Sequence, residues 1–149
     1  MKVHFVHVAV GLVLLLAFGS FQPNWGQAAS AEQSKVRSEP RIQIVEVPSA
    51  DAGGPDRFET IAGSVSGVKV DECKVVVYAF GNAWYVQPFE SAPYTKISTV
   101  GKWRTDVHLG SAYAALLVRS WFRPPAFVQE LPQIGGDVLA VDKVDGRRK

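Results

Sequence analysis

The sequence predicts an all-β fold, an antiparallel immunoglobulin-like β-sandwich of seven or eight strands. Short apolar segments recur along residues 41–144, and clusters rich in Gly, Pro, Asn and Ser separate them. No helical hydrophobic period of ten residues or more occurs in this part of the sequence. The length of 149 residues, with 47% hydrophobic and 20% charged residues, fits one globular domain of this class.

The first 31 residues are predicted to be an export signal. Lys2 precedes an apolar stretch over about residues 8–18, and the small residues Ala29-Ser30-Ala31 form a cleavage site. We expect cleavage after Ala31 and a periplasmic or extracellular location. The alternative is an uncleaved membrane anchor, because the apolar stretch can be extended over residues 3–21, near the roughly 20 residues that a spanning helix needs.

Three further regions follow the signal. Residues 32–40 are polar and predict a flexible leader, residues 41–144 the β-sandwich, and residues 145–149 a short basic tail in solvent. Net charge is only +2, so no large positive field points to nucleic acid. Beyond residue 31 the sequence keeps one histidine, His108, and one cysteine, Cys73, so no intramolecular disulfide is expected.

Eight segments are predicted as strands, in order along the chain. The first is an edge strand with a bulge, because its apolar residues change side between Ile44 and Val45. The segment 101–108 alternates strictly, with Trp103 and Val107 pointing inward and His108 toward water. The segment 112–118 is apolar on both faces and predicts a covered central strand. The eight segments are residues 41–47, 58–67, 73–80, 83–87, 95–100, 101–108, 112–118 and 137–144.

Gly81-Asn82 predicts a two-residue hairpin turn, because both residues tolerate positive φ. That turn pairs Ala79 with Trp84 and Tyr78 with Tyr85, and cross-strand partners share a face. Trp84 is therefore predicted to be core, near Trp103, and its truncation to cost roughly 3 to 5 kcal/mol. The opposite face carries three rings, those of Tyr78, Phe80 and Tyr85.

Two interpretations of that face remain open. Residues 119–131 can fold over it and bury the rings, with Trp121, Phe122 and Phe127 in the cover. Alternatively, Tyr78 and Tyr85 form an exposed strip for a sugar or another chain. For about residues 119–135, the length of the segment and Pro124-Pro125 predict a long loop or a short helical turn.

Spaced core and turn residues over about residues 58–142 carry a resemblance. The patterns Ile61-x-Gly63-x-Val65, Gly101-x-Trp103 and Gly110-x-x-Tyr113 resemble those of immunoglobulin-like and prealbumin-like sandwiches, including carboxypeptidase-regulatory and Cna-B-type modules of exported bacterial proteins. The resemblance implies a spacer, an adhesive unit or a carbohydrate binder. Self-cross-linking Cna-B-type modules resemble one another in a first-strand Lys, which is Arg41 here, so the isopeptide bond is not carried over.

Catalysis and cofactors find little support in the sequence. Cys73 lies in an alternating apolar row, which predicts a buried core residue rather than a nucleophile with His108 as its base. No cofactor is expected, and no metal, because histidine and thiolate ligands are too few. Calcium in the loop of Asp51 and Asp56 is less expected than a solvated turn. A hydrolase could draw its carboxylates from Asp51, Asp56, Glu59, Glu90 and Asp106.

The sequence therefore predicts an exported, non-catalytic binding module, with polysaccharide as the first ligand class. The alternative is a structural or protein-interaction sandwich with a cell-envelope protein as partner, through the edge strand near Ile42 or the loop around Trp121. A carboxylate-dependent hydrolase is the third interpretation. Contact with a membrane is expected only through an uncleaved signal. The candidate ligand-binding residues are Tyr78, Tyr85, Phe80, Trp121, Phe122 and Arg123.

Overall fold

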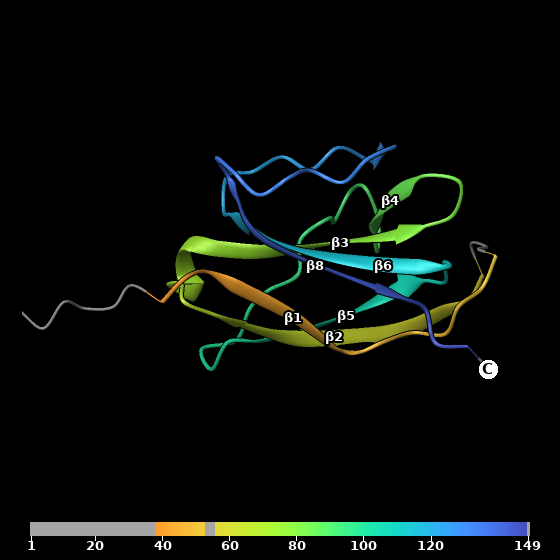
Figure 1. Ribbon diagram of the computed structural model, residues 1–149, viewed down its shortest axis with the longest axis horizontal. Coiled ribbons are helices and arrows are strands. Elements are labelled where there is room, and N and C mark those ends of the chain that lie inside the picture. The colour runs from red at the N-terminus through yellow and green to blue at the C-terminus, as the bar shows by residue number, and fades with distance from the viewer. Residues whose placement is uncertain (1–37, 53–55, 149) are drawn as a thin grey trace, which may run out of the picture. The chain divides into compact units, whose positions relative to one another are not determined.

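The computed structural model describes residues 38–52 and 56–148, which form two antiparallel sheets packed face to face (Figure 1). One sheet has the order β1-β2-β5, with β1 (Arg41–Glu46), β2 (Phe58–Ser66) and β5 (Lys102–His108). The other has the order β7-β4-β3-β6-β8, with β7 (Phe127–Val128), β4 (Trp84–Gln87), β3 (Cys73–Phe80), β6 (Ala112–Arg119) and β8 (Val138–Asp145). A 3-10 turn, η1 (Val70–Glu72), precedes β3. The fold is the predicted antiparallel β-sandwich, with β4 paired to β3.

The predicted export signal and most of the predicted leader lie in residues 1–37, outside the described residues. Within residues 38–52 and 56–148, no helix is long and apolar enough to cross a membrane.

Seven of the eight predicted strands are present. The expected bulge in β1 lies between Ile44 and Glu46, where the register against β2 shifts. The predicted strand over residues 95–100 is wrong, since Thr95 and Ile97 form only isolated bridges. Of the long loop or short helical turn predicted for about residues 119–135, the structure has the loop, which is irregular near Pro124-Pro125 and leads into the two-residue strand β7.

The inner core lies between the two sheets. Residues of β3 and β6 with alternating parity point into it, as their apolar spacing predicts. Trp103 and Val107 of β5 meet them from the facing sheet, as expected. Its buried members are Ile42, Ile44, Ile61, Val65, Cys73, Val75, Val77, Ala79, Trp103, Val107, Tyr113, Ala115, Leu117 and Ala140.

An outer core lies on the other face of the five-stranded sheet, beneath the segment that joins β6 to β8. Figure 1 shows this segment passing over the sheet on the side away from β1, β2 and β5. Phe122, Val128 and Leu131 pack from it onto the sheet. Its irregular backbone also accepts hydrogen bonds, from Tyr78 Oη to Pro125 O at 3.1 Å and from Tyr94 Oη to Phe122 O at 2.6 Å. The covering interpretation of this face is therefore confirmed for Tyr78, which is fully buried.

The hairpin between β3 and β4 corrects the predicted faces. Phe80 pairs with Trp84 and Ala79 with Tyr85, so three residues separate the strands rather than two. The pairing is shifted by one residue, and such a shift exchanges the two faces of a strand. Trp84 is buried as predicted, but in the outer core with Tyr78 and not with Trp103. Tyr85 does not share a face with Tyr78.

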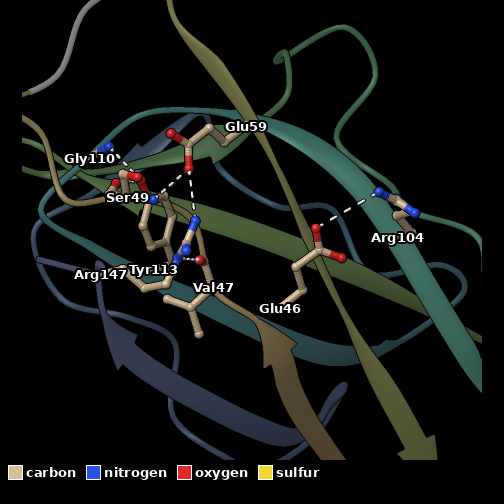
Figure 2. Close-up of polar contacts among 8 residues, drawn as sticks. All are labelled: Glu46, Val47, Ser49, Glu59, Arg104, Gly110, Tyr113 and Arg147. Atoms are coloured by element: carbon tan, nitrogen blue, oxygen red, sulfur yellow. Dashed lines mark hydrogen bonds and ion pairs between the residues drawn. The ribbon is translucent and has the colours of Figure 1, made fainter. Parts of the chain in front are cut away.

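A hydrogen-bonded corner fastens the C-terminal end of the described chain (Figure 2). The hydroxyl of Tyr113 donates to Ser49 O at 2.7 Å and accepts from Gly110 N at 3.0 Å. Glu59 accepts from Ser49 N at 2.7 Å and lies 3.6 Å from the Arg147 guanidinium. Arg147 also donates from its main chain to Pro48 O at 2.8 Å. Arg147 of the predicted tail is exposed, and its main chain and side chain are also bound to the sandwich.

Candidate ligand-binding groove

A groove of about 800 Å³ opens where β3 and β5 end, and we call it the aromatic groove. Its position follows from the topology, because the ends of β3, β4 and β5 meet there and the loop after β4 forms one side. Its lining is mostly apolar. The lining residues are Ala52, Ala79, Phe80, Gly81, Asn82, Tyr85, Val86, Gln87, Pro88, Phe89, Glu90, His108, Leu109, Ala126 and Phe127.

Tyr85 and Phe127 form one wall of the aromatic groove. They are cross-strand partners of β4 and β7, with ring centroids 6.1 Å apart and planes tilted by 35°. The hydroxyl of Tyr85 donates to Asn82 Oδ1 at 2.8 Å, which fixes the ring over the hairpin turn. Tyr85 is 42% exposed and Phe127 58% exposed. The one-residue shift of the hairpin is what brings Tyr85 to this wall.

Phe89 and His108 form the opposite wall, and Phe58 supports it from behind. Phe58 and His108 pair across β2 and β5, with ring centroids 4.1 Å apart. Phe89 meets His108 edge to face at a centroid distance of 5.6 Å. Phe89 is 52% exposed, so it presents a large apolar ring to solvent beside the imidazole. Tyr85 and Phe127 come from the five-stranded sheet, His108 from the three-stranded sheet and Phe89 from the loop after β4, so the groove is a product of the tertiary fold.

Gln87 joins the two walls from below. Its side chain is almost fully buried at the end of β4. Its Oε1 accepts from the main-chain N–H of His108 at 2.9 Å and lies 3.0 Å from His108 Nδ1. Its Nε2 donates to Tyr85 O at 3.2 Å. One buried amide therefore ties β4 of one sheet to β5 of the other, at the floor of the groove.

The described part of the groove lacks the cationic side chains that usually bind anionic ligands. Among its described lining residues there is no Lys or Arg, and Glu90 is the one acidic side chain. Phosphate and carboxylate groups are recognised mainly by cationic donors. The polar lining groups are instead neutral amides and an imidazole, from Asn82, Gln87 and His108. The groove is therefore suited to a neutral ligand with apolar faces.

The predicted site residues fall in three places. Tyr85 lines the groove, and Phe80 does so at its edge while packing on Trp84 at 5.1 Å between centroids. Tyr78 and Phe122 belong to the outer core, which removes them from any surface site. Trp121 and Arg123 are exposed on the cover segment and do not line the groove.

Trp121 is held in place on the surface. It is 62% exposed, and its Nε1 donates to Asp137 Oδ1 at 3.0 Å. The guanidinium of Arg119 lies 5.7 Å from its ring centroid. Trp121 thus forms a second exposed aromatic surface, separate from the groove.

The structure separates the two residues of the candidate Cys73 and His108 pair. Cys73 begins β3 and His108 lies beside the residues that end it, seven residues or roughly 23 Å away along the strand. Burial raises the pKa of the Cys73 thiol, which disfavours a thiolate nucleophile. Within the described residues, no cluster of three or more His, Cys, Asp or Glu side chains could hold a metal. The calcium interpretation involves residues 53–55, which lie outside them.

The candidate carboxylates are mostly engaged with the protein itself. Asp51 forms an ion pair with Arg57, and Asp106 accepts from the Thr60 hydroxyl at 2.9 Å. Glu59 belongs to the corner of Figure 2. Glu90 is the one candidate carboxylate that lines the aromatic groove. The groove therefore offers one carboxylate, where glycoside cleavage by a carboxylate pair requires two.

Sequence reasoning missed Phe58, Phe89 and His108 as site residues and assigned Phe127 to the cover. Phe58 and Phe89 flank polar loop segments, where an isolated ring gives no periodic signal. His108 is the last residue of an alternating strand, and the alternation predicts that it faces solvent. Only the pairing of Phe58 with His108 across β2 and β5 brings these rings together.

No protein-family model matches this chain, and comparisons with characterised proteins and with solved structures found no match.

Proposed function

We propose that this chain is an exported, non-catalytic module that binds a neutral polysaccharide in the aromatic groove. The observation that carries the proposal is the exposure of Tyr85, Phe127 and Phe89 around one concave, mostly apolar surface. Large rings are normally buried in a core of this size, and a contiguous set of exposed rings marks a binding surface. The sequence features of export support the location.

The chemistry of a neutral sugar suits this groove. A pyranose ring has apolar C–H faces that stack on aromatic rings, and hydroxyl groups at its edge that require hydrogen-bond partners. Ligand sites commonly combine apolar walls with a few placed polar groups. Here Tyr85 and Phe127 supply rings, and Asn82, Glu90 and His108 supply polar groups.

The described chain enters the sandwich at the end of β2 that is distant from the groove. β1 begins at Arg41, opposite Ser66 at the end of β2. The groove adjoins Phe58 at the start of β2, eight residues or roughly 26 Å away along the strand. A tether on the N-terminal side would therefore hold the protein by the end that is distant from the groove.

Retention on insoluble polysaccharides tests the proposal. Purified protein is mixed with cellulose, chitin, xylan and peptidoglycan, and the bound fraction is measured for wild type, Tyr85→Ala and Phe127→Ala. Trp121→Ala is the matched control, because it removes an equally exposed ring elsewhere. We expect wild type and the control to be retained on at least one polymer, and both groove variants to be lost. Failure of wild type to bind any of them would reject the proposal.

A protein-interaction module is the second candidate, and Trp121 favours it. A surface Trp beside an Arg is typical of residues that dominate protein interfaces. In this case a protein partner captured by wild type should be lost in Trp121→Ala and kept in Tyr85→Ala. The two variants therefore separate the two candidate functions.

A further inference from the structure

The hydrogen bonds of Gln87 determine which nitrogen of the neutral His108 imidazole carries the proton. Gln87 Oε1 accepts from the main-chain N–H of His108, and its Nε2 donates to Tyr85 O. Both contacts fix the amide orientation, since a reversed amide would face a donor with a donor and an acceptor with an acceptor. The atom that faces His108 Nδ1 at 3.0 Å is therefore an oxygen.

An amide oxygen only accepts hydrogen bonds, so Nδ1 must carry the proton of the neutral imidazole. The remaining nitrogen, Nε2, is then an unprotonated acceptor. Nε2 forms no hydrogen bond with the described residues, and His108 is half-buried where it lines the groove.

We infer that His108 Nε2 accepts a hydrogen bond from a hydroxyl group of the bound glycan and so selects ligands that place a donor beside the aromatic walls. Phe58 contacts the imidazole with the ring planes tilted by 44°, and Phe89 meets it edge to face, so the ring is held between two aromatic neighbours. A ligand that is apolar throughout leaves this acceptor without a partner. His108 is a specificity-determining residue in this assignment, which rests on the proposed function.

Calorimetric titration with hexasaccharides of glucose and of N-acetylglucosamine tests the inference. His108→Phe keeps a ring between Phe58 and Phe89 and leaves Gln87 Oε1 its main-chain hydrogen bond. His108→Gln places an amide near the position of Nε2 and can restore an acceptor. We expect affinity to fall roughly 3- to 10-fold in His108→Phe, the range for one net hydrogen bond, and to recover in part in His108→Gln.

The failures of the two proposals are distinguishable. Binding that Tyr85→Ala abolishes and His108→Phe leaves unchanged overturns the role of His108 and keeps the groove as the glycan site. Absence of wild-type binding to both hexasaccharides and to all four insoluble polymers overturns both.

Nitrogen NMR of the imidazole gives a second readout that a purely structural role of His108 would not move. The His108 signals are identified by their loss in His108→Gln. We expect the Nδ1–H tautomer in the free protein and a shift of the Nε2 resonance when the hexasaccharide binds. An Nε2–H tautomer in the free protein, or an Nε2 resonance unmoved by a saccharide that does bind, overturns the inference.

Discussion

Gln87 Oε1 receives two hydrogen bonds from His108, one from its main-chain N–H at 2.9 Å and one from its imidazole at 3.0 Å. Gln87 ends β4 and His108 ends β5, so the pair joins the two sheets of the sandwich at the floor of the aromatic groove. A nearly inaccessible amide at this point holds both walls of the groove in register.

Gln87→Leu should destabilise the protein by about 1 to 3 kcal/mol, because the main-chain N–H of His108 loses its acceptor in a partly buried position. His108→Phe should cost less, since Gln87 keeps one of its two donors. Urea unfolding of the two variants measures the difference. Equal losses of unfolding free energy would show that the hydrogen bond from the main-chain N–H of His108 does not contribute measurably to stability.

Gly63→Ala should be among the most damaging small substitutions. Gly63 lies in β2, where an added Cβ would come within 1.9 Å of Gln43 O and 2.6 Å of Trp103 Cζ2. We expect a loss of about 3 kcal/mol, as for an overpacked core. Gly81→Ala is the control, because its Cβ would meet nothing closer than Tyr85 Cε2 at 3.9 Å and should cost under about 1 kcal/mol. Thermal unfolding that ranks the two variants in the opposite order would refute the packing of Trp103 on Gly63.

Tyr113→Phe should weaken the corner of Figure 2. The substitution removes the acceptor of Gly110 N and the donor to Ser49 O, both in buried surroundings, and should cost about 2 kcal/mol or more. Tyr94→Phe removes one hydrogen bond, to Phe122 O, and should cost about 1 kcal/mol. Denaturant midpoints compare the two. A smaller loss of stability for Tyr113→Phe than for Tyr94→Phe would contradict the two buried hydrogen bonds of Tyr113 in the corner.

Stability should fall as the pH rises from about 10 to about 12, because burial raises the pKa of Tyr78 from 10.0 to about 12. In this window Tyr78 ionises in the unfolded chain and not in the folded protein. Ionisation therefore stabilises the unfolded state, by at most about 3 kcal/mol. Below pH 10 the hydroxyl is protonated in both states and the contribution is intact. Tyr78→Phe should flatten the decline in unfolding free energy. An unchanged slope in that variant would show that Tyr78 ionises freely in the fold.

Much of the sandwich could be predicted from the sequence, because its signals are local. The strict alternation around Trp103 and the two-sided apolar segment of β6 each reflect a burial pattern along one strand. The two-sided pattern also required a cover, which Phe122 and Leu131 provide. The family resemblance and the export signal stay predictions.

The site was harder to predict, because it depends on one residue of register. Gly81-Asn82 indicates a two-residue turn, but Ala83 also lies in the turn, and Gly81 N donates to Ala83 O at 3.0 Å. This shift moves Trp84 into the outer core and Tyr85 to the groove. Hydrophobicity cannot decide between the two registers, since both faces of β3 are apolar and either would accept a ring.

Chemical-shift mapping of the aromatic rings during titration with a hexasaccharide of a retained polymer tests the central claim most directly. The account predicts shifts of Tyr85, Phe127, Phe89 and His108, with Tyr78 and Trp84 unmoved in the outer core. Shifts confined to Trp121, or a response of Trp84 that exceeds that of Tyr85, would contradict the assignment of the aromatic groove as the binding site.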